Sequence, residues 1–222
     1  MPRVNRLTGV PAKLNGKERY RAESYWEQRY KLGGHSGAGS RGGAAKAKAA
    51  WLATFARSNN VRSIVEFGCG DGFVLRLWWS ALAPAPPRYH GFDLSPSVVR
   101  MNQKKWVSTG NVTFSVLRPL ERPAVDKHGE LTLSMEVLQH IVDQGQYEAY
   151  LDKLFATSAR FVAIYGANIN RRHEAVHMKL RRFTDDVESG CAGRCTSTRA
   201  FEPLRTARDS AHWHVFRRLG LE

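Results

Sequence analysis

The stretch V65-E66-F67-G68-C69-G70-D71-G72 decides the fold, because it joins a short apolar segment to a cluster of glycines. Ser63–Phe67 reads as a buried strand, and residues 73–82 read as a helix. A second strand, Arg88–Asp93, follows at a spacing that suits a right-handed parallel crossover. Glycine is needed where a ligand approaches the backbone, because a Cβ would block the approach or disfavour positive φ. The stretch predicts a βαβ unit with a ligand site at its first turn.

A carboxylate ends the second predicted strand. Asp93 follows Gly72 by 21 residues and can accept hydrogen bonds from both hydroxyls of a ribose, so the two signals together indicate an adenosine-containing cofactor. The main alternative is a dinucleotide-binding loop, which has a third small residue where this chain has Phe73. Glu66 also adds an acid to a strand that such enzymes keep apolar. Both departures favour S-adenosylmethionine (SAM), because its sulfonium cation suits nearby carboxylates.

The rest of the chain alternates between predicted strands and helices. Helices are expected after a capping box at Ser24 and Glu27, over residues 44–57, after Ser95 and Pro96, and over residues 146–156. Further strands are expected at Val112–Val116, 131–135 and 161–165. This alternation predicts an α/β fold, a Rossmann-like three-layer sandwich with a mostly parallel sheet.

The 222 residues suit one domain, which we place at residues 23–222 after a basic, irregular arm at residues 1–22. The net charge of +14 is uneven. Residues 1–62 hold 13 Lys and Arg against 3 Asp and Glu, and residues 63–170 hold 10 against 10. A basic end can be a solvated surface, or it can bind RNA or another polyanion by releasing counterions.

Composition narrows the class of protein. No apolar run reaches the roughly 20 residues that cross a bilayer, and no secretory signal is visible, so we expect an intracellular protein. The cytoplasm is favoured, with a mitochondrial presequence as the alternative reading of the arm. Cys69, Cys191 and Cys195 are too few for a disulfide framework and fit a reducing compartment. The C-x₃-C spacing lacks a second pair, so no metal site is predicted.

On these motifs the chain resembles the class I SAM-dependent methyltransferases, in which an E/D-x-G-x-G-x-G loop precedes an acid after the second strand. It is similar to a group whose N-terminus reads S-Y-W-E-x-R-Y-x-x-G-G-x-S-G-x-G-S, matched here by residues 24–40. The resemblance implies methyl transfer to an unidentified acceptor, and an antiparallel last strand at Ala211–Arg218 at or next to the sheet edge. It implies that SAM is held by Glu66, Gly68, Cys69, Gly70, Gly72 and Asp93.

The resemblance also suggests acceptor-side residues. The related block S-L-D-V-I-Y-H-L corresponds to residues 134–141, so Glu136 replaces an aspartate and His140 is the candidate base. A neutral imidazole can take a proton from an acceptor, or it can simply orient the loop. The remaining candidates for substrate contact or a lid are Ser36, Gly37, Gly39 and Tyr165. A different class of function stays open, a non-catalytic module of this fold that binds RNA or assembles in a ribonucleoprotein.

Overall fold

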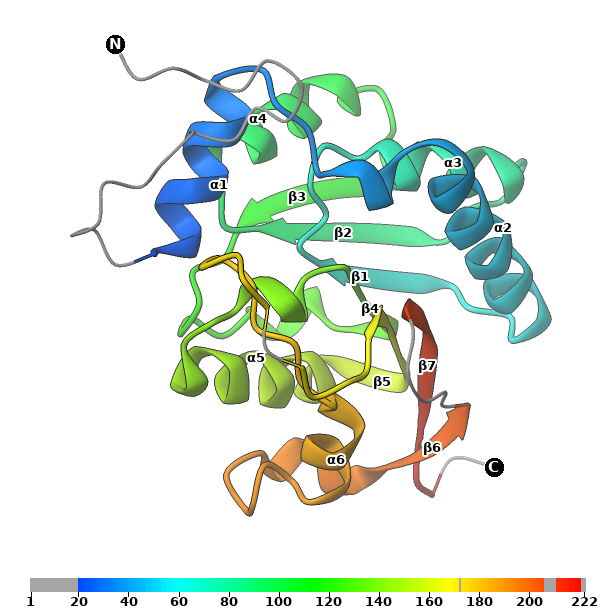
Figure 1. The fold of residues 1–222 in the computed structure, drawn as a ribbon. Coiled ribbons are helices and arrows are strands. Elements are labelled where there is room, and N and C mark those ends of the chain that lie inside the picture. The colour runs from blue at the N-terminus through cyan, green and yellow to red at the C-terminus, as the bar shows by residue number, and fades with distance from the viewer. Residues whose placement is uncertain (1–19, 172, 206–210, 221–222) are drawn as a thin grey trace, which may run out of the picture.

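The computed structural model describes residues 20–171, 173–205 and 211–220, which contain one seven-stranded sheet of order β3-β2-β1-β4-β5-β7-β6 (Figure 1). The strands are β1 (Ser63–Phe67), β2 (Arg88–Asp93), β3 (Val112–Val116), β4 (Gly129–Met135), β5 (Ser158–Ala167), β6 (Phe201–Arg205) and β7 (Ala211–Arg218). Strands β1 to β5 run parallel, whereas β7 is antiparallel to β5 and β6. The carboxyl ends of the parallel strands therefore share one edge.

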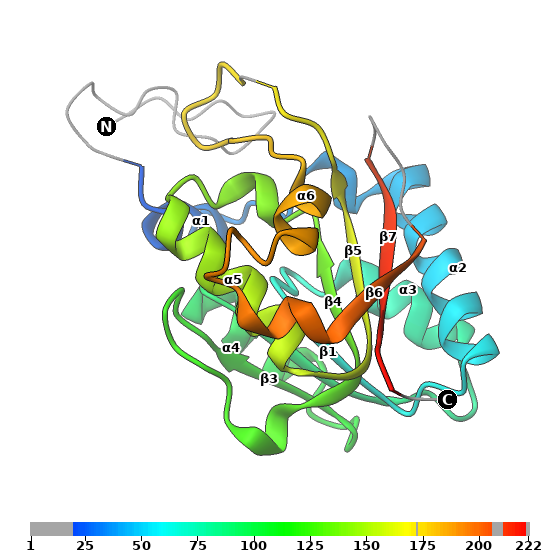
Figure 2. The same ribbon diagram turned by 90° about the horizontal axis from the view of Figure 1, so that it is seen from below.

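Helices cover both faces of the sheet (Figures 1 and 2). One face carries α2 (Gly42–Ser58), α3 (Phe73–Ala81) and α4 (Pro96–Lys105), and the other carries α5 (Gln144–Ala156) and α6 (Phe183–Glu188). The first helix, α1 (Ala22–Lys31), packs beside α4. The predicted Rossmann-like three-layer sandwich with a mostly parallel sheet is confirmed.

Two apolar clusters fill the layers between sheet and helices. On one side Leu52 of α2 and Trp78 of α3 are buried with Ile64 of β1. On the other side Phe155 of α5 is buried with Val65, the next residue of β1. Neighbouring strand residues point to opposite faces, so a strand covered on both faces needs the near-continuous apolar sequence from which β1 was predicted.

The start of α4 agrees with its sequence signal. Ser95 Oγ accepts a hydrogen bond from the Val98 N–H at 3.3 Å, and Pro96 occupies the first helical position. The cap fixes the chain direction immediately after Asp93.

The predicted capping box at Ser24 and Glu27 is wrong. Helix α1 begins at Ala22, and its N-cap residue Arg21 makes no side-chain cap. Glu27 instead accepts hydrogen bonds from Ser95 Oγ at 2.6 Å and from the Ser97 N–H at 3.1 Å. Its carboxylate caps the neighbouring helix α4, whose first N–H groups lack partners within their own helix.

The C-terminal strands follow the prediction in part. Strand β7 is antiparallel and next to the edge, as expected. The edge strand β6 was not predicted, because it contains Pro203. Proline is a signal against a strand, and within sheets it is tolerated at the edge. Most of the predicted arm, residues 1–19, lies outside the described residues.

Candidate functional site

The loop after β1 turns sharply through glycines with positive φ. Gly68 (φ 77°) and Gly70 (φ 54°) adopt conformations that residues with a Cβ rarely take. The N–H groups of Gly68 and Cys69 both donate to the Phe92 carbonyl of β2, at 2.7 and 3.0 Å. A Cβ on Gly70 would lie 2.2 Å from Ser36 Oγ. Both backbone conformation and packing therefore require glycine at position 70.

Asp93 lies beside this loop at the carboxyl end of β2. Its Oδ2 accepts a hydrogen bond from the Gly70 N–H at 2.9 Å, and its Oδ1 accepts one from the Ser95 N–H at 2.9 Å. Burial raises the pKa of Asp93 to about 6 although these donors favour the ionised form. The Leu94 N–H is a third backbone donor to this carboxylate, whose two oxygens offer about four lone pairs in all.

Glu66 is buried below the loop. The Tyr89 hydroxyl donates to its Oε2 at 2.6 Å, and burial raises the pKa of Glu66 to about 7. Cys69 is a buried free thiol whose pKa burial raises well above its usual value. Two carboxyl groups held in the protein interior therefore flank the glycine loop, and a cationic ligand would favour their ionised forms.

The Gly/Ser-rich segment packs on the glycine loop. The Ser36 N–H donates to Asp71 Oδ2 at 3.1 Å, and the Asp71 N–H donates to Ser36 Oγ at 3.0 Å. Tyr30 of α1 shares a hydrogen bond of 3.0 Å with Ser36 Oγ, and Arg41 forms an ion pair with Asp71. This segment, residues 36–40, is therefore held over the glycine loop and is called the cover segment below. It is not an unattached linker.

These groups line one pocket at the carboxyl edge of the sheet. Its empty space, including the part open to solvent, is about 1070 Å³. Its wall includes Ser36, Glu66, Gly68, Cys69, Gly70, Asp93, Glu136 and His140 among the predicted site residues. Gly37, Gly39, Gly72 and Tyr165 do not belong to the pocket wall formed by the described residues.

His140 ends the 3-10 helix Leu138–His140 that follows β4. Its ring packs edge-on against Trp26 at 5.2 Å and is stacked with His177 at 5.7 Å between ring centres. Its Nδ1 lies 3.3 Å from the His177 carbonyl oxygen. Burial lowers the pKa of His140 to about 4, so the imidazole is neutral at pH 7.

Glu136 follows β4 directly and has a positive φ of 60°, which is rare for a residue with a Cβ. Gln139 Nε2 donates to its Oε2 at 3.1 Å, and Lys48 Nζ lies 3.4 Å from its Oε1. Gly39 lies over the same carboxylate, since a Cβ there would be 3.1 Å from Oε1. The cover segment and the end of β4 therefore meet at Glu136.

Several solved methyltransferase structures have the same fold as this chain. Magnesium protoporphyrin IX methyltransferase (ChlM) from Synechocystis PCC 6803, with bound SAH, is 15% identical, with a TM-score of 0.57 over 78% of this chain and 83% of that chain. The methyltransferase domain of bacterial CtHen1-C is 16% identical, with a TM-score of 0.60 over 79% and 98%. No family model matches the sequence, and no curated protein matches it significantly.

The N-methyltransferase NodS from Bradyrhizobium japonicum WM9, in complex with S-adenosyl-L-homocysteine, is 15% identical, with a TM-score of 0.53 over 78% of this chain and 85% of that chain. The chain has the class I methyltransferase fold. The [4+2]-cyclase SpnF also matches it, at 15% identity and a TM-score of 0.54. The class I methyltransferase fold alone therefore does not fix the reaction, which has to be argued from the site.

The pocket of this methyltransferase fold includes residues that sequence reasoning missed. Trp26 and Tyr30 of α1 line it, although the sequence indicated only a short helix there. Their spacing of four residues places them on one side of that helix, which is the only signal that pointed to a shared surface. Lys48 of α2, expected on a helix of good helix formers, is buried beside Glu136.

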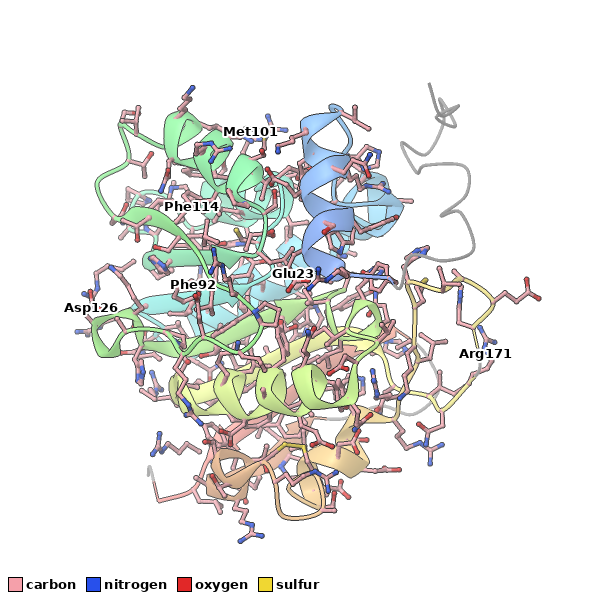
Figure 3. All side chains as sticks on the ribbon, turned by 90° about the vertical axis from the view of Figure 1, so that its left-hand side faces the viewer. Glu23, Phe92, Met101, Phe114, Asp126 and Arg171 are labelled. Carbon is pink, nitrogen blue, oxygen red and sulfur yellow. A yellow bond between two sulfur atoms is a disulfide. The ribbon has the colours of Figure 1, made fainter. Side chains whose placement is uncertain are left out.

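Two basic runs follow β5, and their sequence fits either a solvated helix face or a grip on an acidic acceptor. The described part of residues 171–182 forms no helix. Arg171 and Leu180 form an isolated antiparallel bridge, and Arg181 is buried with its guanidinium donating to the Ile141 carbonyl at 2.8 Å. The segment contacts α1, where Tyr25 is stacked on His177 at 5.1 Å between ring centres. Arg171, near the start of the segment, is labelled in Figure 3. Contacts with the pocket rim hold the segment in place without a helix.

Two of the three cysteines do not fit the prediction of reduced thiols. Cys191 and Cys195 form a disulfide with a Cα–Cα distance of 5.2 Å. Positive φ angles fold the chain back on itself here, at Gly190, Cys191, Ala192 and Gly193.

Within the described part of the chain, no group of three or more His, Cys, Asp and Glu side chains is placed to hold a metal ion. Among the same residues, no helix is long and apolar enough to cross a membrane.

Proposed function

We propose that the chain is a SAM-dependent methyltransferase. The observation that carries this proposal is the pair of buried carboxyl groups, Glu66 and Asp93, that flank a glycine loop on the wall of one pocket. SAM combines a ribose, which suits Asp93, with a sulfonium and an ammonium group, which suit the second carboxylate.

In this proposal the protein supplies positioning and exclusion of water. Asp93 would bind the ribose hydroxyls, while Glu66 and the loop of Gly68, Cys69, Gly70 and Gly72 would hold the methionine half. Bound SAM would supply an electrophilic methyl group. The cover segment from Ser36 to Ser40, with Gly37 and Gly39, would shield the site, and Glu136, His140 and Tyr165 would face the acceptor.

Asp93→Ala is expected to weaken SAM binding by about 1–3 kcal/mol, because two ribose hydroxyls lose a charged hydrogen-bond acceptor. Titration calorimetry with SAM and SAH measures this directly. Asp126→Ala removes a carboxylate whose side chain is 69% exposed and serves as the matched control, with unchanged affinity expected. Heat from NAD, with none from SAM or SAH, would contradict the proposal.

A non-catalytic role in a ribonucleoprotein is the second candidate, and the charge of the first 62 residues supports it. Labelling of an extract by methyl-labelled SAM, abolished by Asp93→Ala, would leave this candidate without support.

We extend the proposal to an RNA partner for the basic arm. Deleting residues 1–19 should then weaken RNA binding and leave SAM affinity unchanged. The slope of log affinity against log salt concentration should become shallower by about 0.7 for each lost contact with a phosphate of single-stranded RNA. Equal RNA affinity with and without these residues would show that the arm does not bind RNA.

We also propose an intracellular and cytoplasmic location for the chain. The Cys191–Cys195 bond is the one observation against this location, because disulfides are rare in reducing compartments. Subcellular fractionation, combined with thiol alkylation of the fresh extract, tests both points.

A further inference from the structure

Lys48 is a buried cation on the apolar side of α2. Its side chain is 1% exposed, and the helix residues buried with it include Ala45, Ala49 and Leu52. Its Nζ lies 3.4 Å from Glu136 Oε1 and 4.8 Å from the centre of the Tyr165 ring. Replacing a buried ion pair by apolar residues is often neutral or stabilising. Stability alone therefore does not account for a lysine at this position.

The partner carboxylate is fixed from several sides. Lys48 contacts one oxygen of Glu136, and Gln139 donates to the other. The Glu136 N–H donates to the Tyr165 carbonyl at 2.8 Å, which holds the backbone in its positive φ. A positive φ at a residue with a Cβ is strained and persists where the surroundings impose it, often at functional sites. The side chain remains 29% exposed and lies on the pocket wall.

His140, the other acceptor-side candidate, is held differently. Its ring lies between Trp26 and His177, and Nδ1 lies near the His177 carbonyl oxygen. These contacts suit a residue that shapes the pocket rim.

We propose that Glu136 accepts the proton of an acceptor that carries an O–H or N–H group, and that Lys48 is the residue that positions Glu136 for this step. The proposal rests on the proposed methyl transfer. The lone pair of the acceptor oxygen or nitrogen forms the bond to the methyl carbon. The carbon–sulfur bond breaks with its electron pair going to sulfur, and the acceptor proton passes to the Glu136 carboxylate. Alcohols, phenols, amines and amides fit this description, whereas thioethers and tertiary amines do not.

Lys48→Met tests the assignment, with Lys46→Met as the matched control, because Lys46 is exposed on the same helix. SAM affinity, measured by calorimetry, should be the same in both variants and in the wild type. Transfer of labelled methyl groups to the extract at saturating SAM should fall about 10–100-fold in Lys48→Met, since a misplaced group costs up to this factor. Glu136→Gln should lose about 100-fold or more, the usual contribution of a general base. Lys46→Met should transfer at the wild-type rate.

The double variant Lys48→Met/Glu136→Gln separates positioning from a structural role. Each single variant leaves one charge of the pair without its partner and should lower the urea unfolding midpoint. The double variant removes both charges, so its midpoint should return to that of the wild type, while transfer stays low. Recovery of transfer together with stability would overturn the proposal, as would unchanged transfer in Lys48→Met with SAM bound. Mass spectrometry of the labelled product should locate the methyl group on an oxygen or nitrogen that carried a proton, and a methylated thioether would overturn the acceptor class. Failure of the wild type to bind SAM would instead remove the proposed function itself.

Discussion

Gly70→Ala is expected to destabilise the protein by about 3 kcal/mol, from roughly 1–2 kcal/mol of left-handed backbone strain and the loss of one or two hydrogen bonds. Gly70 has a φ of 54°, and its new Cβ would meet Ser36 Oγ at 2.2 Å. Ser36 would have to move, which separates it from Asp71 and lifts the cover segment from the loop. Loss of SAM binding should accompany the loss of stability.

Gly43→Ala is the matched control for this prediction. Gly43 lies in α2, and a Cβ there would meet nothing within 4 Å. Alanine in place of a helical glycine should stabilise the protein by about 0.5–1 kcal/mol. Urea unfolding and SAM calorimetry on both variants are the measurements, and equal stability of the two would show that position 70 does not need glycine.

Glu27→Ala is expected to cost about 2–3 kcal/mol at pH 7, since one hydrogen bond to a charged group contributes about 1.5–3 kcal/mol and water replaces part of the three that are lost. The Glu27 carboxylate accepts from Ser95 Oγ, the Ser97 N–H and Ser97 Oγ, at 2.6, 3.1 and 2.7 Å. Its loss would free α1 from the start of α4 and loosen the residues that follow Asp93. SAM affinity should therefore fall as well.

The pH dependence of this effect has a definite sign. Burial alone would raise the pKa of Glu27, but the hydrogen bonds from Ser95 and Ser97 lower it from 4.5 to about 2. The stabilisation is complete above pH 4.5 and is lost as the pH falls towards 2. Urea unfolding of wild type and Glu27→Ala should diverge at pH 7 and converge at acid pH. Gln28→Ala, an exposed neighbour on α1, should follow the wild type throughout. A difference that stays constant with pH would assign the stability of Glu27 to packing.

Local signals were enough to predict the part of the site that follows the strands. Alternating apolar segments placed β1, β2 and β3 within their observed bounds, and the glycine loop and Asp93 lie together because strand carboxyl ends share an edge. The other wall of the pocket depends on contacts between distant segments. The spacing of Ser24 and Glu27 is that of a capping box. The Glu27 carboxylate nevertheless accepts its hydrogen bond from Ser97, 70 residues later in the chain, and so caps α4 and not its own helix.

Burial of single polar residues was the second limit. Helical spacing does place Lys48 on the side of α2 that carries Leu52 and Phe55, whereas Lys46 is exposed. What the sequence does not show is the partner of that buried charge, the carboxylate that β4 brings to this side of the helix. The Cys191–Cys195 bond likewise depends on successive left-handed residues that no propensity predicts.

The position of α1 has a consequence for how the molecule assembles. This helix is synthesised before the sheet, yet it touches residues that come much later in the chain. Glu27 reaches Ser97, Tyr20 donates to the His140 carbonyl across 120 residues, and Tyr25 stacks on His177. Contacts between such distant segments form late in folding, because closing long loops costs chain entropy. We expect hydrogen exchange to show the amides of α1 opening before those of the central strands β1 and β4. The pocket is complete only while α1 is docked, because Trp26 and Tyr30 form part of its wall.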